Sequence, residues 1–168
     1  MVAIRPGTLD DLPFLREMLF EAAYWRPGQA RPDLEVGLER PDLVYLLADW
    51  GRDDDAALIA VTEAGEAVGA AWFRFWGPEQ HSYGYVSPQI PELGIAVRAD
   101  FRGQGIGHQL IRSILNLAAS HGIEQVSLSV EIENLALNLY QQHGFEPVQK
   151  NPKDWVMVAS LDNSPGSN

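Results

Sequence analysis

The sequence predicts a mixed α/β (α+β) fold in which helices cover both faces of one mostly antiparallel sheet. Residues 56–62 and 67–76 are apolar runs joined by a short turn around Gly65, as in an antiparallel hairpin. Within residues 91–130, strand, helix and strand patterns alternate, which requires a crossover connection and some parallel pairing. The 168 residues, 46 % of them hydrophobic, provide enough apolar material for one core.

The N-terminal part is predicted to contain one short strand and two helices. Residues 2–5 alternate as a strand. A helix is expected to begin near Asp11, because Pro13 then falls in its first turn, where the missing N–H is tolerated. After a loop, a second helical region spans roughly residues 33–50 and is interrupted by Pro41.

The C-terminal part follows the hairpin through a long polar and aromatic loop, residues 77–91, into a strand at 93–97. Residues 106–121 carry apolar side chains at helical spacing. The remaining predicted elements are a strand at 126–130, a helix at 134–143 and strands at 145–150 and 155–161. The resulting order is β-α-α-β-β-β-α-β-α-β-β. Residues 1–161 are expected to form one domain, and the polar tail 162–168 is expected to be disordered.

Composition excludes several classes of protein. The net charge of −11 repels phosphate backbones, so we expect no nucleic-acid partner. The sequence contains no run of about 18 apolar residues, so no membrane span is expected. Its N-terminus lacks the basic and then apolar pattern of a signal peptide. Cysteine is absent, which excludes disulfides and a cysteine nucleophile and fits a cytoplasmic location; no metal site is expected. The acidic surface favours a cationic partner, although solubility alone also accounts for it.

The stretch DFRGQGIG, residues 100–107, places three glycines at alternate positions between a predicted strand and a predicted helix. The first N–H groups of a helix have no internal partner, and its dipole adds positive charge there, so phosphate groups bind at such ends. Arg98, Arg102 and Arg112 stand against the single acid Asp100 in this region. The stretch therefore predicts an anion site on a locally basic surface.

Three phosphate-binding signatures and one structural alternative compete for this stretch. The mononucleotide loop requires a lysine that is missing here, and the dinucleotide fingerprint fails because His108 stands where its third glycine belongs. The pattern R-x-x-G-x-G is present through Arg102, Gly105 and Gly107. A tight strand-to-helix turn without a ligand is the alternative.

Two motifs together resemble the GCN5-related N-acetyltransferase family. ELGIAVRADFRGQGIG, residues 92–107, is similar to the family's fourth strand and acyl-CoA diphosphate loop. NLALNLYQQHGF, residues 134–145, is similar to the helix that follows its fifth strand. The resemblance covers nearly the whole chain. It implies the acyl-CoA N-acyltransferase fold, with acetyl-CoA as co-substrate, and a gap between the fourth and fifth strands that holds pantetheine.

The resemblance also implies which residues bind the co-substrate. The backbone of Ile95 and Val97 would bond the pantetheine arm, and the N–H groups of residues 102–107 would hold the diphosphate. Asn134 would contact pantetheine or cap a helix, although Glu133 stands where many relatives have the asparagine. The full predicted set is Ile95, Ala96, Val97, Arg102, Gly103, Gln104, Gly105, Ile106, Gly107, Asn134 and Tyr140.

Tyr140 matches the family's tyrosine near the CoA sulfur. A thiol is a stronger acid than a phenol, so we expect Tyr140 to hydrogen-bond the leaving thiolate or to relay a proton that arrives from the amine. Packing as a core aromatic side chain is the alternative. The N–H of Val97 would polarise the thioester carbonyl.

Glu92 is the predicted proton acceptor for the amine, at the head of the fourth strand. Strand alternation places Glu92, Gly94 and Ala96 on one face, so the carboxylate can point into an acceptor cleft. A solvated acid at a strand end is the alternative. The side chains of the 77–91 loop that provide further candidates for the base are His81, Tyr83 and Tyr85.

The predicted reaction is transfer of the acetyl group to a primary amine by direct attack in a ternary complex, because no cysteine can carry an acyl intermediate. The acceptor is expected to be a cationic small molecule or peptide. Its binding site is expected to be lined by Tyr24, Trp25, His81, Tyr83 and Tyr85. A homodimer is implied by the resemblance alone. A non-catalytic acyl-CoA-binding module and a nucleotide-binding oxidoreductase are the other two functions considered.

Overall fold

The computed structural model describes residues 1–161, and the predicted tail 162–168 lies outside the described residues. The helices and strands follow the predicted order: β1 (Val2–Pro6), α1 (Leu12–Ala23), α2 (Leu34–Leu38), β2 (Ala56–Thr62), β3 (Ala67–Arg74), β4 (Glu92–Val97), α3 (Ile106–Ser120), β5 (Gln125–Glu131), α4 (Ala136–Gln142), β6 (Phe145–Lys150) and β7 (Asp154–Ser160). Short 3-10 turns at Leu9–Asp11 and Ala99–Phe101 precede α1 and follow β4.

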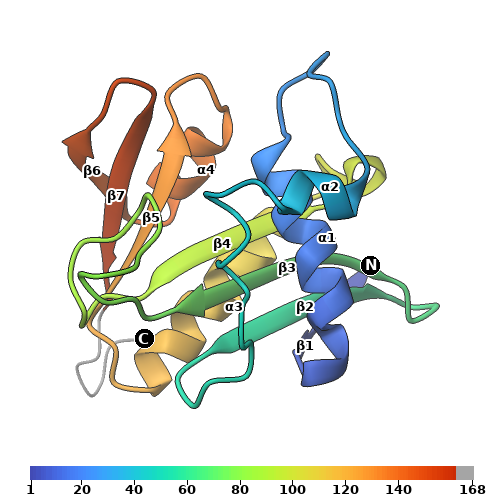
Figure 1. Ribbon diagram of the computed structural model, residues 1–168. Coiled ribbons are helices and arrows are strands. Elements are labelled where there is room, and N and C mark those ends of the chain that lie inside the picture. Colours follow the sequence, from blue (N-terminus) through green and yellow to red (C-terminus); the bar gives the residue numbers. More distant parts are fainter. Residues whose placement is uncertain (162–168) are drawn as a thin grey trace.

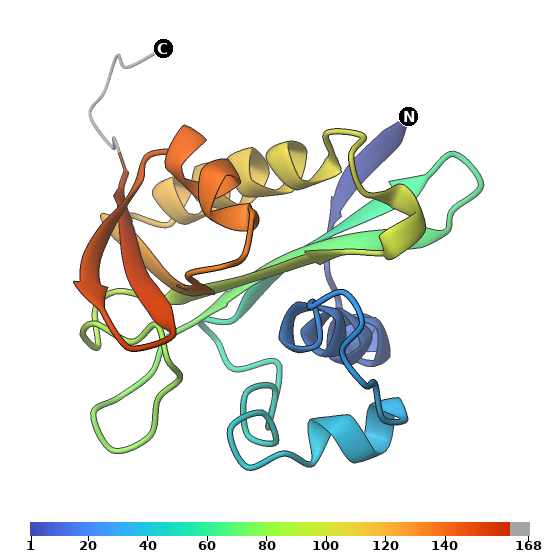
Figure 2. The ribbon, with the colours of Figure 1, turned by 90° about the horizontal axis from the view of Figure 1, so that it is seen from above.

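The strands form one seven-stranded sheet in the order β1-β2-β3-β4-β5-β7-β6. All neighbours pair antiparallel except β4 and β5, which pair parallel. Seen from above, α1 and α2 lie on one side of the sheet and α3 and α4 on the other (Figure 2). The predicted mixed sheet with helices on both faces is confirmed. Within residues 1–161, no helix is both long and apolar enough to cross a membrane.

Each face of the sheet has its own hydrophobic core. On one face, α3 places Ile106, Leu110 and Ile114 at intervals of four residues, and all three are buried against the sheet. On the other face, α1 buries Leu15 and Met18 against β2 and β3. Burying such side chains contributes about 1.5–3 kcal/mol each, so the two helices fix the sheet from both sides.

Strands β4 and β5 meet at a single rung, Glu92 opposite Ser127, and then diverge (Figure 1). The N–H of Ser127 donates to the carbonyl of Pro91 across this rung at 2.9 Å. On the other edge, the N–H of Arg98 donates to β3 at 2.8 Å. Because successive residues of a strand point their backbone groups to opposite edges, Ile95 and Val97 direct their N–H and C=O groups into the gap.

The predicted second helix is wrong in length, because α2 ends at Leu38 and residues 39–49 form turns and a bend. Pro41 has no N–H for a helix. Further along, Arg74 takes two carbonyls that a helix would use, with Nη1 donating to Leu46 at 3.1 Å and to Ala48 at 2.7 Å. β3 also ends at Arg74, two residues earlier than predicted.

Arg74 is the anchor of the whole 39–55 segment. Its guanidinium forms a bidentate ion pair with Asp55, at 2.9 and 2.8 Å, and both side chains are buried, with 2 % and 4 % exposed. Trp50 and Trp76 lie over the guanidinium, 5.2 and 5.6 Å from its carbon. Through these bonds the segment is held on the α1 face of the sheet without regular secondary structure.

Asp55→Ala is expected to lower the free energy of unfolding by about 3–5 kcal/mol, because it leaves Arg74 buried without its carboxylate. Urea denaturation followed by circular dichroism measures this loss. Glu35→Ala is the matched control, since it removes the exposed Arg16–Glu35 pair, and we expect a change below about 1 kcal/mol. Equal effects of the two substitutions would contradict the anchoring role of Arg74.

Candidate active site

One cavity of about 1310 Å³ connects the glycine turn, the gap after the β4–β5 rung and the 77–91 loop. It brings together residues that are far apart in the sequence, from the end of α1 to the turn between β6 and β7. Of the predicted catalytic and co-substrate residues, Gln104 alone is outside its lining. Those that line it are Glu92, Ile95, Ala96, Val97, Arg102, Gly103, Gly105, Ile106, Gly107, Asn134 and Tyr140.

The three positions of the turn require glycine for two different structural reasons. Gly103 and Gly105 have φ angles of +77° and +83°, which side chains rarely tolerate, and a Cβ at either would meet nothing within 4 Å. Gly107 lies inside α3, where a Cβ would come within 3.2 Å of Leu139 on α4. The first two therefore leave open space at the start of α3, where unpaired N–H groups and the helix dipole favour a diphosphate.

The predicted basic surface near this turn is largely neutralised by acids of α1. Arg98 forms a bidentate pair with Glu17 at 2.9 and 3.0 Å. Arg102 donates from Nε to the Val97 carbonyl at 2.9 Å and from Nη2 to Glu21 at 3.1 Å. The anion site consequently depends mainly on backbone N–H groups rather than on free arginine side chains.

Glu92 lies on the same face of β4 as Gly94 and Ala96, which is the α1 face of the sheet, and it lines the cavity. Its Oε1 accepts a hydrogen bond from the N–H of Gly84 at 3.2 Å, whereas Oε2 is buried and has no partner within residues 1–161. Burial raises the pKa of Glu92 to about 7, against the opposing effects of bonds from Ser82 and Gly84 and of the charge of His81. The carboxyl group can therefore gain and lose a proton near neutral pH.

The 77–91 loop packs directly over the β4–β5 rung at Gly84. A Cβ there would lie 2.7 Å from the backbone of Leu128 and 3.0 Å from Cδ of Glu92. Only a glycine permits this approach. The hydroxyl of Ser127, on the β5 side of the rung, is buried without a partner among the described residues. The loop thus excludes solvent from one side of the Glu92 carboxyl group.

Tyr140 lies on α4 with its ring packed edge-on against Phe145, at a centroid distance of 5.9 Å. Burial raises the pKa of Tyr140 above its usual value, and its hydroxyl has no hydrogen-bond partner within residues 1–161. It therefore remains protonated and available as a donor to a group in the cavity. Asn134 lies two residues before α4, where its Oδ1 accepts the N–H of Ala136, the first residue of that helix, at 2.9 Å, and it lines the cavity as well.

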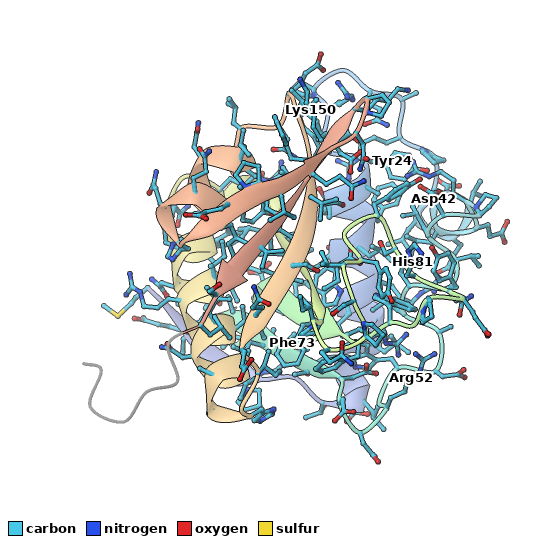
Figure 3. All side chains as sticks on the ribbon, turned by 90° about the vertical axis from the view of Figure 1, so that its left-hand side faces the viewer. Tyr24, Asp42, Arg52, Phe73, His81 and Lys150 are labelled. Carbon is cyan, nitrogen blue, oxygen red and sulfur yellow. The ribbon has the colours of Figure 1, made fainter. Side chains whose placement is uncertain are left out.

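Two of the five predicted acceptor-lining residues, Trp25 and Tyr83, line the cavity. The other three have different contacts. The Tyr24 hydroxyl donates to the Gly37 carbonyl at 3.2 Å, and the ring of His81 stacks on that of Tyr85 at 4.3 Å. Figure 3 shows His81 on the same side of the sheet as Asp42, opposite α3.

Sequence analysis missed most of the cavity wall around Glu92, which we call the acceptor end. It consists of Arg40, Asp42, Leu43, Leu46, Trp72, Trp76, Ser82, Tyr83 and Glu92. The charged pair in the segment Arg40-Pro41-Asp42 was a usable signal, because it flanks the proline that stops the helix. Trp72 pairs with Gly94, and a Cβ at that glycine would come within 2.5 Å of the indole ring, a contact that the sequence alone does not show.

Comparison with known proteins assigns this arrangement to a family. Residues 16–145 match the acetyltransferase (GNAT) family. The chain belongs to this family. The GNAT assignment confirms the resemblance found in the two sequence motifs, and it agrees with the acyl-CoA N-acyltransferase fold of similar solved structures.

Two curated relatives and one solved structure illustrate the match. A mycothiol acetyltransferase from Jonesia denitrificans is 30 % identical over 152 residues, which cover 88 % of this chain and 43 % of that protein. An L-methionine sulfoximine/L-methionine sulfone acetyltransferase from Pseudomonas aeruginosa is 33 % identical over 90 residues, which cover 53 % and 49 %. The matched part of the chain spans about half the length of these curated relatives.

The solved structure is a PaiA N-acetyltransferase from Thermoplasma acidophilum in complex with coenzyme A. Its TM-score is 0.69 at 17 % identity, with 96 % of this chain and 99 % of that chain covered, so the two share the GNAT fold. Both curated relatives named above are acetyltransferases.

Gly105→Trp is expected to abolish acetyl-CoA binding, because an indole would fill the open space at the start of α3. Isothermal titration calorimetry measures the affinity. Gly122→Trp is the matched control at the other end of the same helix, where φ is +78° and a Cβ likewise meets nothing within 4 Å. Both substitutions strain the backbone, but only Gly105→Trp fills the space at the start of α3. An equal loss of affinity in the two variants, or no loss in Gly105→Trp, would contradict the assignment of the diphosphate site to this turn.

Proposed function

We propose that the protein is an acetyl-CoA-dependent N-acetyltransferase that acetylates the primary amine of a small molecule. The observation that carries this proposal is the single cavity, which joins the glycine turn to Glu92 and Tyr140 along the gap between β4 and β5. The relatives named for mycothiol and L-methionine sulfoximine favour a small acceptor. The net charge of −11 favours an acceptor that arrives as an ammonium ion.

Backbone groups would hold the co-substrate. The N–H groups at the start of α3, from Gly103 to Ile106, suit the two phosphates of a diphosphate. The edge of β4 at Ile95 and Val97 suits an extended amide arm that pairs like an added strand. Acetyl-CoA supplies an activated thioester, and the N–H of Val97 would polarise the carbonyl of that thioester. The backbone carbonyl of Val97 is not available to the ligand in the same way, because it accepts a hydrogen bond from Arg102.

Glu92 would accept the proton of the amine. An alkylammonium with a pKa near ~10.4 is less than about one part in a thousand free base at pH 7, so a base is required. Glu92 has a pKa of about 7, and its Oε2 has no other partner within the described residues. A carboxyl group tuned in this way is ionised at a slightly alkaline pH yet basic enough to receive a proton.

Tyr140 would donate a hydrogen bond to the departing thiolate. A thiol near pKa ~8.5 is more acidic than a phenol near ~10, so complete transfer from tyrosine to sulfur is uphill by about 2 kcal/mol. Burial of Tyr140 raises its pKa further and increases that difference. Since the chain has no cysteine, the amine would attack the thioester directly in a ternary complex. A cytoplasmic location and a homodimer belong to the same proposal.

The central experiment measures CoA release from acetyl-CoA with a panel of primary amines. A thiol reagent detects only CoA, because the protein itself contains no cysteine. We expect turnover with wild type and a kcat roughly 10- to 100-fold lower in Tyr140→Phe, with little change in acetyl-CoA affinity. Tyr85→Phe, outside the cavity, is the control. Tight acetyl-CoA binding without turnover of any amine would favour the non-catalytic module, and a loss of affinity alone in Tyr140→Phe would indicate a packing role.

Glu92→Gln is expected to lower turnover and to remove one inflection from the pH profile. In wild type, kcat/KM should rise as Glu92 ionises and show an inflection at about pH 7. The same raised pKa means that ionisation opposes folding, so wild-type stability should fall as pH rises from about 4.5 to 7, and the variant should lack this fall. Glu79→Gln, an exposed position on the same loop, should change neither profile. An unchanged pH profile in Glu92→Gln would assign the base elsewhere.

A further inference from the structure

The acceptor end of the cavity combines apolar side chains with two hydroxyl groups, of Ser82 and Tyr83, and three charged side chains. Leu43, Leu46, Trp72 and Trp76 contribute the apolar lining, and Glu92, Asp42 and Arg40 contribute the charges. The other arginine and lysine side chains that line the cavity lie elsewhere, at the glycine turn and between β6 and β7. Arg40 is therefore the cation available to a molecule bound near Glu92 within the described residues.

Arg40 is held in one orientation by three separate segments of the chain. Its Nε and Nη2 donate to Asp42, at 2.6 and 2.8 Å. From the 77–91 loop, the Tyr83 hydroxyl donates to the same carboxylate at 2.9 Å. The carbon of the guanidinium lies 5.3 Å from the ring centre of Tyr24, at the end of α1. A ligand that binds Arg40 consequently meets a preorganised group.

Asp42 occupies only one edge of the guanidinium. The two close hydrogen bonds to Asp42 use Nε and Nη2, so Nη1 and the second N–H of Nη2 form the outer edge, with the Tyr24 hydroxyl as a weaker polar neighbour of the guanidinium. Such a pair of parallel N–H groups matches the two oxygens of a carboxylate. The side chain is 40 % exposed, so this edge is accessible. Asp42 also offsets the positive charge, which favours a ligand that gains directed hydrogen bonds over a bare anion.

Arg40 and Glu92 line the same cavity, and the 77–91 loop connects their surroundings. Tyr83 donates to the carboxylate that holds Arg40, and the N–H of the next residue, Gly84, donates to Glu92. Burial raises the pKa of Tyr45, and the charges of Glu92 and Asp42 raise it further, so both carboxylates act on the same side chain. Tyr45 in turn packs edge-on against Trp76, with ring centres 5.7 Å apart. The acceptor end thus offers a carboxylate site, a proton acceptor and apolar contacts in one chamber.

We propose that the acceptor is an α-amino acid with an uncharged apolar side chain, an assignment that rests on the proposed acetyl transfer. Arg40 binds its carboxylate through the free guanidinium edge, its amine faces Glu92, and its side chain contacts the tryptophans and leucines of the acceptor end. A polyamine would instead bring a second cation toward Arg40. Arg40 is thereby a specificity-determining residue and takes no part in proton transfer.

The test compares L-leucine with its decarboxylated counterpart, isoamylamine, and with L-leucinamide, which keep the amine and the side chain but lack the carboxylate. We expect wild type to acetylate leucine with a KM roughly 10- to 100-fold lower than that of either analogue. Arg40→Ala should erase this preference by raising the KM of leucine, whereas the KM values of isoamylamine and acetyl-CoA should change less than about threefold. Arg40→Gln keeps a hydrogen-bonding side chain, so its KM for leucine should lie between the values of wild type and Arg40→Ala. Arg16→Ala, an exposed arginine outside this cavity, is the control.

Two results would overturn the assignment of Arg40 while leaving acetyl transfer intact. One is wild type that uses isoamylamine or leucinamide as well as leucine, and the other is an equal rise in all KM values in Arg40→Ala. Calorimetric titration of leucine into the CoA-saturated protein distinguishes failure of the proposed acetyl transfer from failure of the proposed amino-acid site. Leucine binding that requires Arg40, without turnover of any amine, would overturn the proposed acetyl transfer and support the amino-acid site; neither turnover nor binding would overturn both.

Discussion

The single rung between Glu92 and Ser127 is the constraint on which the site depends. Two neighbouring strands of a sheet normally satisfy each other's backbone groups, and here they stop doing so after one pair. The cores on both faces hold β4 and β5 in their places, so the gap cannot close by local rearrangement. The N–H and C=O groups of Ile95 and the N–H of Val97 therefore face the cavity, where an extended ligand or water must satisfy them, whereas the Val97 carbonyl accepts a hydrogen bond from Arg102. The same rung fixes Glu92 where the gap begins.

Local signals explain why the element order and the glycine turn could be predicted from sequence. A proline in the first turn of α1, the apolar spacing of α3 and the glycines around residue 105 each act within a few residues. The parts that sequence analysis missed depend on distant partners. Arg98 and Arg102 find their carboxylates 81 residues away on α1, so the predicted basic surface is paired. Arg74 reaches 26 and 28 residues back to the carbonyls that a second helix would have used.

Those distant contacts also decide what kind of acceptor the site favours. The net charge describes the whole surface, and from it the sequence suggested only a cationic partner. Inside the cavity a few oriented groups matter more, because they act at hydrogen-bond distance and with little solvent screening. The Arg74–Asp55 pair holds the irregular 39–55 segment on the sheet, and this segment brings Arg40 and Asp42 to the acceptor end. A structural ion pair thus positions a different, partly exposed pair, Arg40 and Asp42, in the lining of the cavity.

Burial shifts the two reactive side chains in the same direction but with opposite consequences. It raises the pKa of Glu92 from an ordinary carboxyl value to about 7, which turns a weak base into one that exchanges protons at neutral pH. It raises the pKa of Tyr140 away from neutrality, which leaves the phenol as a permanent donor. In the proposed reaction, Glu92 would therefore take the proton from an incoming ammonium, whereas Tyr140 would keep its own proton and stabilise the leaving sulfur by a hydrogen bond. Burial produces both effects, so the difference between the two groups comes from their chemistry and position. Glu92, at the rung, would accept the proton of the amine, and Tyr140, on α4, would donate a hydrogen bond to the sulfur.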